Sequence, residues 1–262
     1  GDVVTIDPNM YCNNCDPCHM GKKQYCEHMS AIGVNQNGGF EDYCAVPETQ
    51  AVVISNKVDY EEAAFGEPVA CCLHGMDNIQ VQAGDIVVVI GGGSIGQIMC
   101  QLARINGASK VVLSEPVAMR RELAISLGAD GAIDPMSGNL NEQLKELTGK
   151  EYADVVIECV GRPVAVKQAF TMAARGAKIL IFSVPSPNDT VELPLADVFK
   201  KELTIKGSFV NPDTQLRAAR LIGSGKLNLK PLVTHRYPVE KLEEAIKMQM
   251  SNESVKVMII PE

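Results

Sequence analysis

The chain has 262 residues, 46% of them hydrophobic and 21% charged, which is the balance of a globular protein with one large domain or two ordinary ones. The net charge of -8 is spread along the chain without a basic stripe, so nucleic acid is excluded as an expected partner. No apolar run approaches the roughly 20 residues that cross a bilayer, so we expect no membrane partner either.

The first 66 residues have the pattern of short strands separated by turns. β-Branched and aromatic residues bounded by Gly or Pro mark three segments, at 3–8, 38–47 and 51–55. We therefore expect a small β structure in this part of the chain, interrupted by a loop that is rich in cysteine.

Four cysteines in that loop, Cys12, Cys15, Cys18 and Cys26, are spaced C-x2-C-x2-C-x7-C. Disulfides are disfavoured, because nine cysteines without a secretory signal indicate reduced thiols and a cytoplasmic location. A C-x-x-C redox pair would leave two cysteines unexplained, and an iron–sulfur cluster stays open as an alternative. Four thiolates around Zn²⁺ are the simplest interpretation, and such a site is closed to water and substrate. We therefore predict a structural metal site and not a catalytic one.

From residue 84 onward, strand and helix patterns alternate. Near-continuous Val and Ile runs are typical of parallel strands that are buried on both faces. The alternation predicts an α/β fold with a doubly wound parallel sheet. Strands are expected at 86–90, 110–114, 131–133, 153–159, 177–182 and 204–209, and helices at 95–107, 117–127, 139–148, 163–174 and 213–223. A helix near 239–250 and another β segment follow, and these can fold back onto the first region.

Gly91, Gly93 and Gly96 form a G-x-G-x-x-G pattern between an expected strand and an expected helix. In this context the glycines allow a tight turn, and the helix N-terminus attracts a pyrophosphate. Glu115 follows the next strand, where a carboxylate can accept hydrogen bonds from the adenosine ribose and repel a 2′-phosphate. The pattern predicts a dinucleotide site that favours NAD, although a cation nearby, Arg120 or Arg121, could partly offset the repulsion. The alternative is an ordinary βα turn with a solvent-facing glutamate.

Together these features resemble the zinc-dependent medium-chain dehydrogenase/reductase superfamily, most closely its polyol (sorbitol-like) branch. The cysteine lobe, the G-G-G-S-I-G loop with Glu115, E-C-V-G at 158–161 and P-L-V-T-H-R-Y-P at 231–238 occur in the family's order, over essentially the whole chain. The resemblance implies a Rossmann NAD-binding domain over residues 67–223. It also implies a GroES-like catalytic domain that lacks its N-terminal part, formed by residues 1–66 and a return segment, 224–262, with a structural zinc lobe over 10–30.

The resemblance also assigns roles to single residues. Glu67 lies where the polyol branch places a glutamate beside the catalytic zinc, and it would bind that metal directly or through water. The alternative is a first-turn carboxylate that interacts with the helix dipole. Cys12, Cys15, Cys18 and Cys26 would hold the family's structural zinc. The implied cofactor contacts are Gly91, Gly93, Ser94, Ile95 and Gly96 at the pyrophosphate, Glu115 and Arg120 at the adenosine, and Cys159, Val160, Gly161, Val184 and Phe209 at the nicotinamide.

Two departures from the family pattern bear on activity. The Cys and the Gly-His-Glu motif that hold the family's catalytic zinc lie upstream of the cysteine lobe, and neither is found in these 262 residues. Glu67 alone would not retain a zinc, so we expect the chain as given to bind nucleotide and structural zinc without turnover. Val210 stands where animal sorbitol dehydrogenases carry an arginine, which argues against sorbitol and leaves other polyols, sugar phosphates and 2,3-diols open.

For the intact enzyme, the resemblance implies reversible, NAD-dependent oxidation of a secondary alcohol or polyol to a ketone. It also implies a homo-oligomer, a dimer or a tetramer, joined largely through the edge strands of the Rossmann domains. Two alternatives are a non-catalytic nucleotide-binding zinc module and a metal-independent quinone or enoyl reductase of the same superfamily. Such reductases lack the four-cysteine lobe, so the lobe counts against the second alternative.

Overall fold

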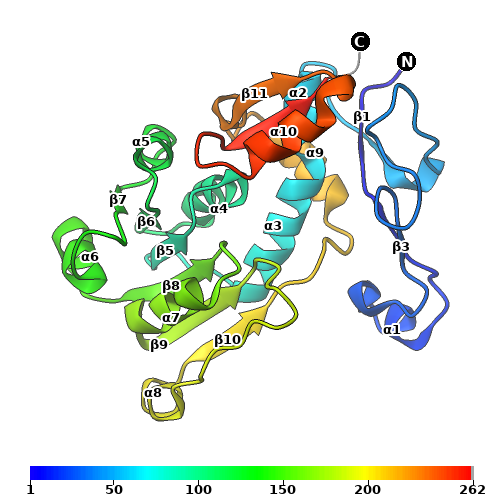
Figure 1. Ribbon diagram of the computed structural model, residues 1–262. Coiled ribbons are helices and arrows are strands. Elements are labelled where there is room, and N and C mark those ends of the chain that lie inside the picture. The colour runs from blue at the N-terminus through cyan, green and yellow to red at the C-terminus, as the bar shows by residue number, and fades with distance from the viewer. Residues whose placement is uncertain (261–262) are drawn as a thin grey trace. The chain divides into compact units, whose positions relative to one another are not determined.

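The computed structural model describes residues 1–260, which form two compact units (Figure 1). Unit 1 contains residues 1–74 and the segment from residue 209 onward, which is called the return segment from here on. Unit 2 is the continuous stretch 75–208. Helix α3 (Gly66–Ile79) contains the first boundary between the units, so it begins in unit 1 and ends in unit 2.

Unit 2 is built on a six-stranded sheet in which every neighbouring pair of strands is parallel. The strands are β5 (Ile86–Ile90), β6 (Lys110–Ser114), β7 (Gly131–Ile133), β8 (Ala153–Glu158), β9 (Ala173–Ile181) and β10 (Thr204–Gly207). Their order across the sheet is β10-β9-β8-β5-β6-β7, so the chain reverses its direction of travel between β5 and β8. In such a sheet, ligands bind at the carboxyl ends of the strands beside this switch point.

Helices cover the sheet of unit 2, and Val and Ile side chains form the core beneath them. The helices are α4 (Ser94–Ile105), α5 (Ala118–Ser126), α6 (Leu140–Thr148), α7 (Pro163–Met172) and α8 (Leu195–Lys201). On one face, Leu144 of α6 and Phe170 of α7 pack against strand residues such as Val88 and Val156. Alternate strand residues, such as Val87 and Val89, are buried on the opposite face. The α/β class and the doubly wound parallel sheet are thus confirmed.

Unit 1 consists of short strand pairs and helices. β1 (Val4–Ile6) pairs antiparallel with β4 (Ala51–Val53), β2 (Asn9–Met10) pairs antiparallel with β3 (Ser30–Ala31), and β11 (Val233–Tyr237) pairs parallel with β12 (Lys256–Ile259). Its helices are α1 (Asp16–His19), α2 (Tyr60–Ala63), α9 (Gln215–Gly223) and α10 (Leu242–Gln249). The β2–β3 pair encloses the cysteine loop, so both ends of that loop are held together.

The segment that returns from unit 2 is tied to the start of the chain by buried amides. Asn9 Nδ2 donates to Asn211 Oδ1 at 2.6 Å, and Asn211 is fully buried. Gln215 Nε2 donates to Thr5 Oγ1 at 3.1 Å, and Thr214 Oγ1 donates to the carbonyl oxygen of residue 70 at 2.8 Å. These bonds join parts of unit 1 that are far apart in the sequence.

One expected strand is wrong. Residues 38–47 form no strand, and Phe40 and Tyr43 in this segment are 59% and 90% exposed. A strand is stable only when a neighbour takes its hydrogen bonds, and β1 and β4 are each the partner of the other. Helix α8 was not expected. Its Leu195 and Phe199 are exposed, and Val198 is its apolar residue that packs against the core.

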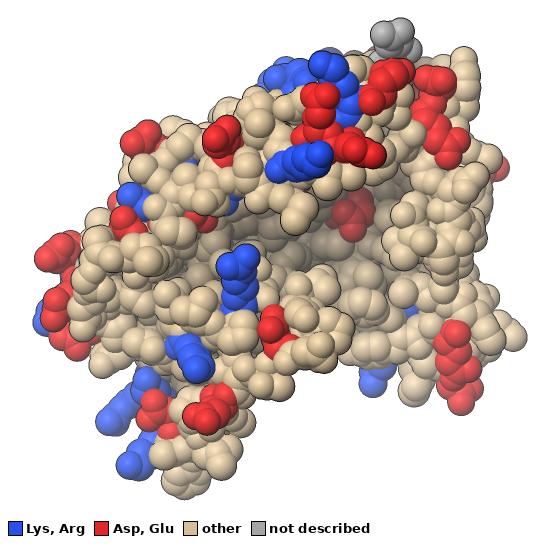
Figure 2. Space-filling model, in the orientation of Figure 1, with Lys and Arg blue, Asp and Glu red and all other residues tan. Residues whose placement is uncertain are grey.

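Basic and acidic side chains are interspersed over the face shown in Figure 2. Within residues 1–260, no helix is both long enough and apolar enough to span a bilayer.

Asp130 fastens α4 and β6 to the turn before β7, and its loss should cost stability. Its carboxylate accepts from Val111 N at 2.8 Å and pairs with Arg104 and, at 3.4 Å, with Lys110. Burial raises the pKa of Asp130, but the Val111 amide and these two cations outweigh it and bring the pKa below 3.8. This stabilisation is therefore present above pH 3.8 and is lost as the pH falls through the lower pKa of the folded state.

We expect Asp130→Asn to lower the free energy of unfolding at neutral pH by about 1–2 kcal/mol. The difference from the wild type should shrink in acid, where the wild-type carboxylate is protonated as well. Denaturant titrations at neutral and acidic pH measure this, with the exposed Asp197→Asn as the control. An equal loss at both pH values would contradict the role of the charge.

Candidate cofactor and metal sites

The glycine loop joins β5 to α4 at the carboxyl edge of the sheet. Gly91 has φ +101°, in the left-handed region, and a Cβ there would lie 2.8 Å from Val160 Cγ2. A Cβ on Gly96 would lie 1.8 Å from the carbonyl oxygen of Gly91. Both positions therefore require glycine because of the chain's own packing.

Gly93 is different, because nothing in the chain lies within 4 Å of a Cβ built there. It is the N-cap residue of α4, and no side chain caps the first turn of that helix. Ser94 and Ile95 form the beginning of this turn and are partly buried. The space in front of an uncapped helix N-terminus is where backbone N–H groups can bind an anion.

Glu115 lies directly after β6 and is only 4% exposed. Its Oε2 accepts from Gly92 N at 2.6 Å and its Oε1 from Val117 N at 2.9 Å. Arg120 Nη1 is 4.0 Å from Oε1. The carboxylate thus holds the glycine loop and lies beside Arg120, and it is not a solvent-facing side chain.

Two residues of this site were not predicted from the sequence. Gly92 is held by Glu115, and a Cβ on Gly92 would lie 2.8 Å from Glu115 Cγ. Gln97 is fully buried, and its Nε2 donates to Gly92 O at 3.1 Å and Arg120 O at 2.8 Å. The signal for Gln97 was a lone polar side chain in the apolar run I-G-Q-I-M-C.

The residues expected at the nicotinamide follow two neighbouring strands. Cys159, Val160 and Gly161 come directly after β8, and Val184, which is 92% exposed, comes shortly after β9. The structure brings these four together at the carboxyl edge of unit 2, next to the switch point. Phe209, the fifth, is the first residue of the return segment in unit 1 and is half exposed.

The four cysteines of the loop converge, and their sulfur atoms all lie within 4.8 Å of one another. Cys12 Sγ is 4.0 Å from Cys18 Sγ. This is close to the separation of two sulfurs that bind the same Zn²⁺ ion, each at about 2.3 Å from the metal. Backbone N–H groups point at the sulfurs, such as Cys12 N toward Cys26 Sγ at 3.3 Å and Cys15 N toward Cys12 Sγ at 3.3 Å. This donor set fits a tetrahedral zinc.

The thiols of this cluster differ in acidity. The hydrogen bond from the Cys12 amide lowers the pKa of Cys26, despite its burial. Burial, together with hydrogen bonds to Cys15 and Cys26, raises the pKa of Cys18 to about 12. Since zinc binds thiolates, its binding must release protons, and zinc affinity should rise with pH.

Glu67 begins the first turn of α3 in unit 1. Cys71 Sγ, one turn along the helix, donates to Glu67 Oε1 at 3.1 Å. Burial raises the pKa of Asp7, and the charge of Glu67 raises it further. Burial lowers the pKa of Lys256, and Glu67 opposes that effect. Glu67 is thus a carboxylate among titratable groups, but among residues 1–260 the cysteine cluster is the only group of three or more candidate metal ligands.

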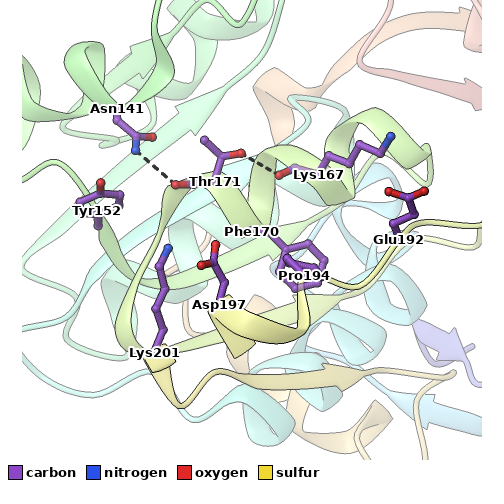
Figure 3. Close-up of a pocket in the computed structure, with 9 residues that line it drawn as sticks. All are labelled: Asn141, Tyr152, Lys167, Phe170, Thr171, Glu192, Pro194, Asp197 and Lys201. Carbon is purple, nitrogen blue, oxygen red and sulfur yellow. Dashed lines mark hydrogen bonds between the residues drawn. The ribbon is translucent and has the colours of Figure 1, made fainter. Parts of the chain in front are cut away.

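A broad depression of about 570 Å³ in unit 2 is not part of these sites (Figure 3). Tyr152, Thr171 and Lys201, which line it, precede β8, β9 and β10, so it lies toward the amino ends of these strands. Two lysines, Lys167 and Lys201, line it. The ammonium group of Lys201 is already engaged: its Nζ donates to Ala173 O at 3.1 Å and lies 5.3 Å from the centre of the Tyr152 ring. The predicted cofactor contacts are all at the opposite edge of the sheet or in unit 1.

Comparison with known proteins places the chain in a family. A family model of the alcohol dehydrogenase GroES-like domain matches residues 1–56, and one of zinc-binding dehydrogenases matches residues 94–222. D-Arabinitol dehydrogenase 1 of Uromyces fabae is 32% identical over 265 aligned positions, which cover 100% of this chain and 75% of that protein. The chain belongs to the zinc-dependent medium-chain dehydrogenases. This dehydrogenase is of the polyol-type branch, as the sequence resemblance predicted.

Solved structures support the same assignment for the dehydrogenase. A zinc-binding dehydrogenase from Sinorhizobium meliloti 1021 bound to NADP matches with a TM-score of 0.94 and 37% identity, over 100% of this chain and 77% of that one. An alcohol dehydrogenase from Escherichia coli CFT073 complexed with NADH matches with a TM-score of 0.91 and 27% identity, over 99% and 77%. The dehydrogenase is therefore an oxidoreductase of a family that acts on alcohols with zinc and a nicotinamide cofactor.

Proposed function

We propose that this dehydrogenase, when it holds a catalytic zinc, uses NAD to oxidise a secondary alcohol of a polyol to a ketone, reversibly, in the cytoplasm. The observation that supports the cofactor in this proposal is the open space at Gly93 before α4. The other two glycines of the G-x-G-x-x-G pattern, Gly91 and Gly96, are fixed by packing. The name of the U. fabae relative, an arabinitol dehydrogenase, supports a polyol as the substrate.

In this proposal the residues of unit 2 would hold the cofactor. The first-turn N–H groups of α4 bind the pyrophosphate, and Glu115 accepts hydrogen bonds from the ribose hydroxyls while Arg120 contacts the adenosine. Residues 159–161 and Val184 would line the nicotinamide. When bound, the nicotinamide accepts the hydride, and a catalytic zinc acidifies the alcohol.

We assign Cys12, Cys15, Cys18 and Cys26 to a structural zinc and Glu67 to the neighbourhood of the catalytic zinc. A catalytic zinc normally takes three protein ligands, and Glu67 lies in no such group within residues 1–260. We therefore infer that these 262 residues by themselves bind nucleotide and one zinc but do not oxidise alcohols. This second candidate, a binding module without turnover, rests on that single ligand.

Metal analysis and cofactor titration test both candidates. We expect about one zinc per chain and enhanced fluorescence of NADH when the chain is added, with no reduction of NAD in the presence of arabinitol. Two zinc ions per chain, with turnover, would favour the active enzyme. Failure to bind NADH or ADP-ribose at millimolar concentration would refute the dinucleotide site itself.

We predict a preference for NAD over NADP. The charge of Glu115 repels a 2′-phosphate, and the nearby Arg121 is already engaged: its Nη1 donates to the Glu115 and Pro116 carbonyls at 2.7 and 2.8 Å. We expect ADP-ribose to bind at least about tenfold more tightly than its 2′-phosphorylated form, which corresponds to roughly 1.4 kcal/mol. Calorimetric titration with both compounds measures this.

Tighter binding of the 2′-phosphorylated compound would overturn that preference. It would then assign this protein the cofactor found in the S. meliloti structure, which holds NADP. Arg121→Ala is the informative variant in that case, because it removes a cation beside Glu115 without removing the carboxylate.

We also propose that the dehydrogenase forms a homo-oligomer through β10. This strand is at the edge of the sheet, and all four of its residues are exposed. An exposed edge strand offers unpaired backbone groups to a second strand. A monomer in sedimentation experiments at micromolar concentration would contradict this assignment.

A further inference from the structure

Glu158 is a buried carboxylate at the carboxyl end of β8, and the cofactor contacts proposed above do not include it. It is 0% exposed. A carboxylate in that position must be compensated by hydrogen bonds or by a cation, because burying a bare charge is costly. Its partners in the described part of the chain are neutral donors.

Both carboxylate oxygens of Glu158 are engaged by the loops that follow β8 and β9. Oε1 accepts from Val160 N at 2.7 Å and from Gly161 N at 2.8 Å. Oε2 accepts from the Ser183 hydroxyl. The carbonyl oxygen of Glu158 also accepts from Phe182 N at 3.0 Å, so the end of β9 is attached to the same residue.

The loops held by Glu158 fit closely against their neighbours. Gly161 has φ +79°, and a Cβ on it would lie 3.0 Å from the carbonyl oxygen of Val184. On the other side, a Cβ on Gly91 would touch Val160 Cγ2 at 2.8 Å. In its present position the 159–161 turn therefore lies close to both the glycine loop and residues 183–184.

There is also space into which this turn could relax if the carboxylate were lost. A cavity of about 130 Å³ adjoins Glu158, Gly161 and Ser183. The packing alone therefore does not fix the turn, and the hydrogen bonds to the carboxylate decide its position.

We propose that Glu158 is a positioning residue for the nicotinamide half of the cofactor. Its carboxylate sets the orientation of the 159–161 turn and of Ser183, and so the wall against which the nicotinamide ring rests. This inference depends on the proposed dinucleotide site. Different residues hold the two halves of the cofactor in this proposal. The pyrophosphate and adenosine are held by residues 91–96, Glu115 and Arg120, and none of these bonds to the carboxylate of Glu158, so the two halves can be tested separately.

The test compares NADH with ADP-ribose, which lacks the nicotinamide, on the whole chain. We expect Glu158→Ala to weaken NADH binding by about tenfold or more and to leave ADP-ribose binding within about twofold of the wild type. The fluorescence of bound NADH should also fall, because the ring becomes more mobile. Glu158→Gln keeps a side-chain oxygen that can accept from the two amides, and its NH2 group can donate to the Ser183 hydroxyl oxygen. This variant should therefore restore NADH binding to within about threefold. Glu146→Ala, an exposed glutamate of α6, is the matched control and should change neither affinity.

Three results would overturn the proposal. These are an unchanged NADH affinity in Glu158→Ala, an equal loss for NADH and ADP-ribose, and no rescue by Glu158→Gln. If Glu158→Ala does not fold, Ser183→Ala removes one of the three donors and should show a smaller loss for NADH alone. A wild-type chain that binds neither compound would instead refute the dinucleotide site on which the inference depends.

Discussion

Gly96→Ala is expected to abolish dinucleotide binding and to destabilise unit 2. The added Cβ would lie 1.8 Å from the carbonyl oxygen of Gly91, and that atom belongs to the backbone, so the loop or α4 must move. Overpacking of this kind costs about 1–3 kcal/mol of stability, and the displaced loop would lose most contacts with a pyrophosphate. We expect an affinity for ADP-ribose lowered by at least about 100-fold, together with a lower melting temperature.

Gly93→Ala is the matched control for this prediction. Its methyl group meets nothing in the chain, so the melting temperature should stay at the wild-type value. It projects into the space before α4, so ADP-ribose binding should still weaken, by about tenfold. Wild-type binding by Gly93→Ala would show that the pyrophosphate does not lie in that space, and wild-type stability of Gly96→Ala would contradict the packing argument.

Cys26→Ser is expected to remove the structural zinc and to unfold the lobe of residues 10–30. The lobe has few buried side chains of its own besides Cys18 and Cys26, so the metal must supply most of its stability. Structural zinc contributes apparent binding free energies of roughly 10–16 kcal/mol in small zinc domains, and three ligands retain the metal poorly. The zinc content, measured by elemental analysis, should fall from about one ion per chain to nearly none, and a protease should cut within the lobe.

Cys44→Ser is the control for the cysteine prediction, because Cys44 is half-buried and lies outside the cluster. It should keep its zinc and its resistance to proteolysis. Full zinc retention by Cys26→Ser would mean that the metal lies elsewhere, and iron in place of zinc would support the iron–sulfur alternative. In the wild type, zinc loss to a chelator should accelerate as the pH falls, because protons compete with zinc for the four thiolates.

ADP-ribose binding by Cys26→Ser gives an additional comparison. The cysteine cluster belongs to unit 1, and the glycine loop belongs to unit 2, which is continuous in sequence. We therefore expect the variant to retain its affinity for ADP-ribose even when the lobe is unfolded.

The sheet of unit 2 was predictable because its signals are local. A run such as I-V-V-V-I at β5 can only be a buried strand, and the glycines that follow it restrict the next turn. The spacing of the four cysteines likewise predicted their convergence. In both cases, neighbouring residues in the sequence carry the constraint.

The remaining features depend on contacts between distant residues. No local pattern predicts that the carboxylate of Glu115 accepts a hydrogen bond from Gly92 N. Nor does one predict that Glu158 accepts from the hydroxyl of Ser183, in the loop that follows the next strand. The strand expected at 38–47 does not form, because its local pattern is strand-like but no partner strand lies beside it. Pairing is a property of the whole fold and cannot be read from the segment.

The amide bonds of the return segment have a consequence for how this protein is made. Asn9 and Asn211 are 202 positions apart, and Thr5 and Gln215 are 210 positions apart. Residues 1–74 leave the ribosome before the return segment does, and they cannot complete these hydrogen bonds until that segment has been synthesised. The continuous stretch 75–208 has all its strands within one interval and can fold as soon as it emerges. During synthesis, unit 2 can therefore become ordered before unit 1, whose two parts meet only after the stretch between them has been made.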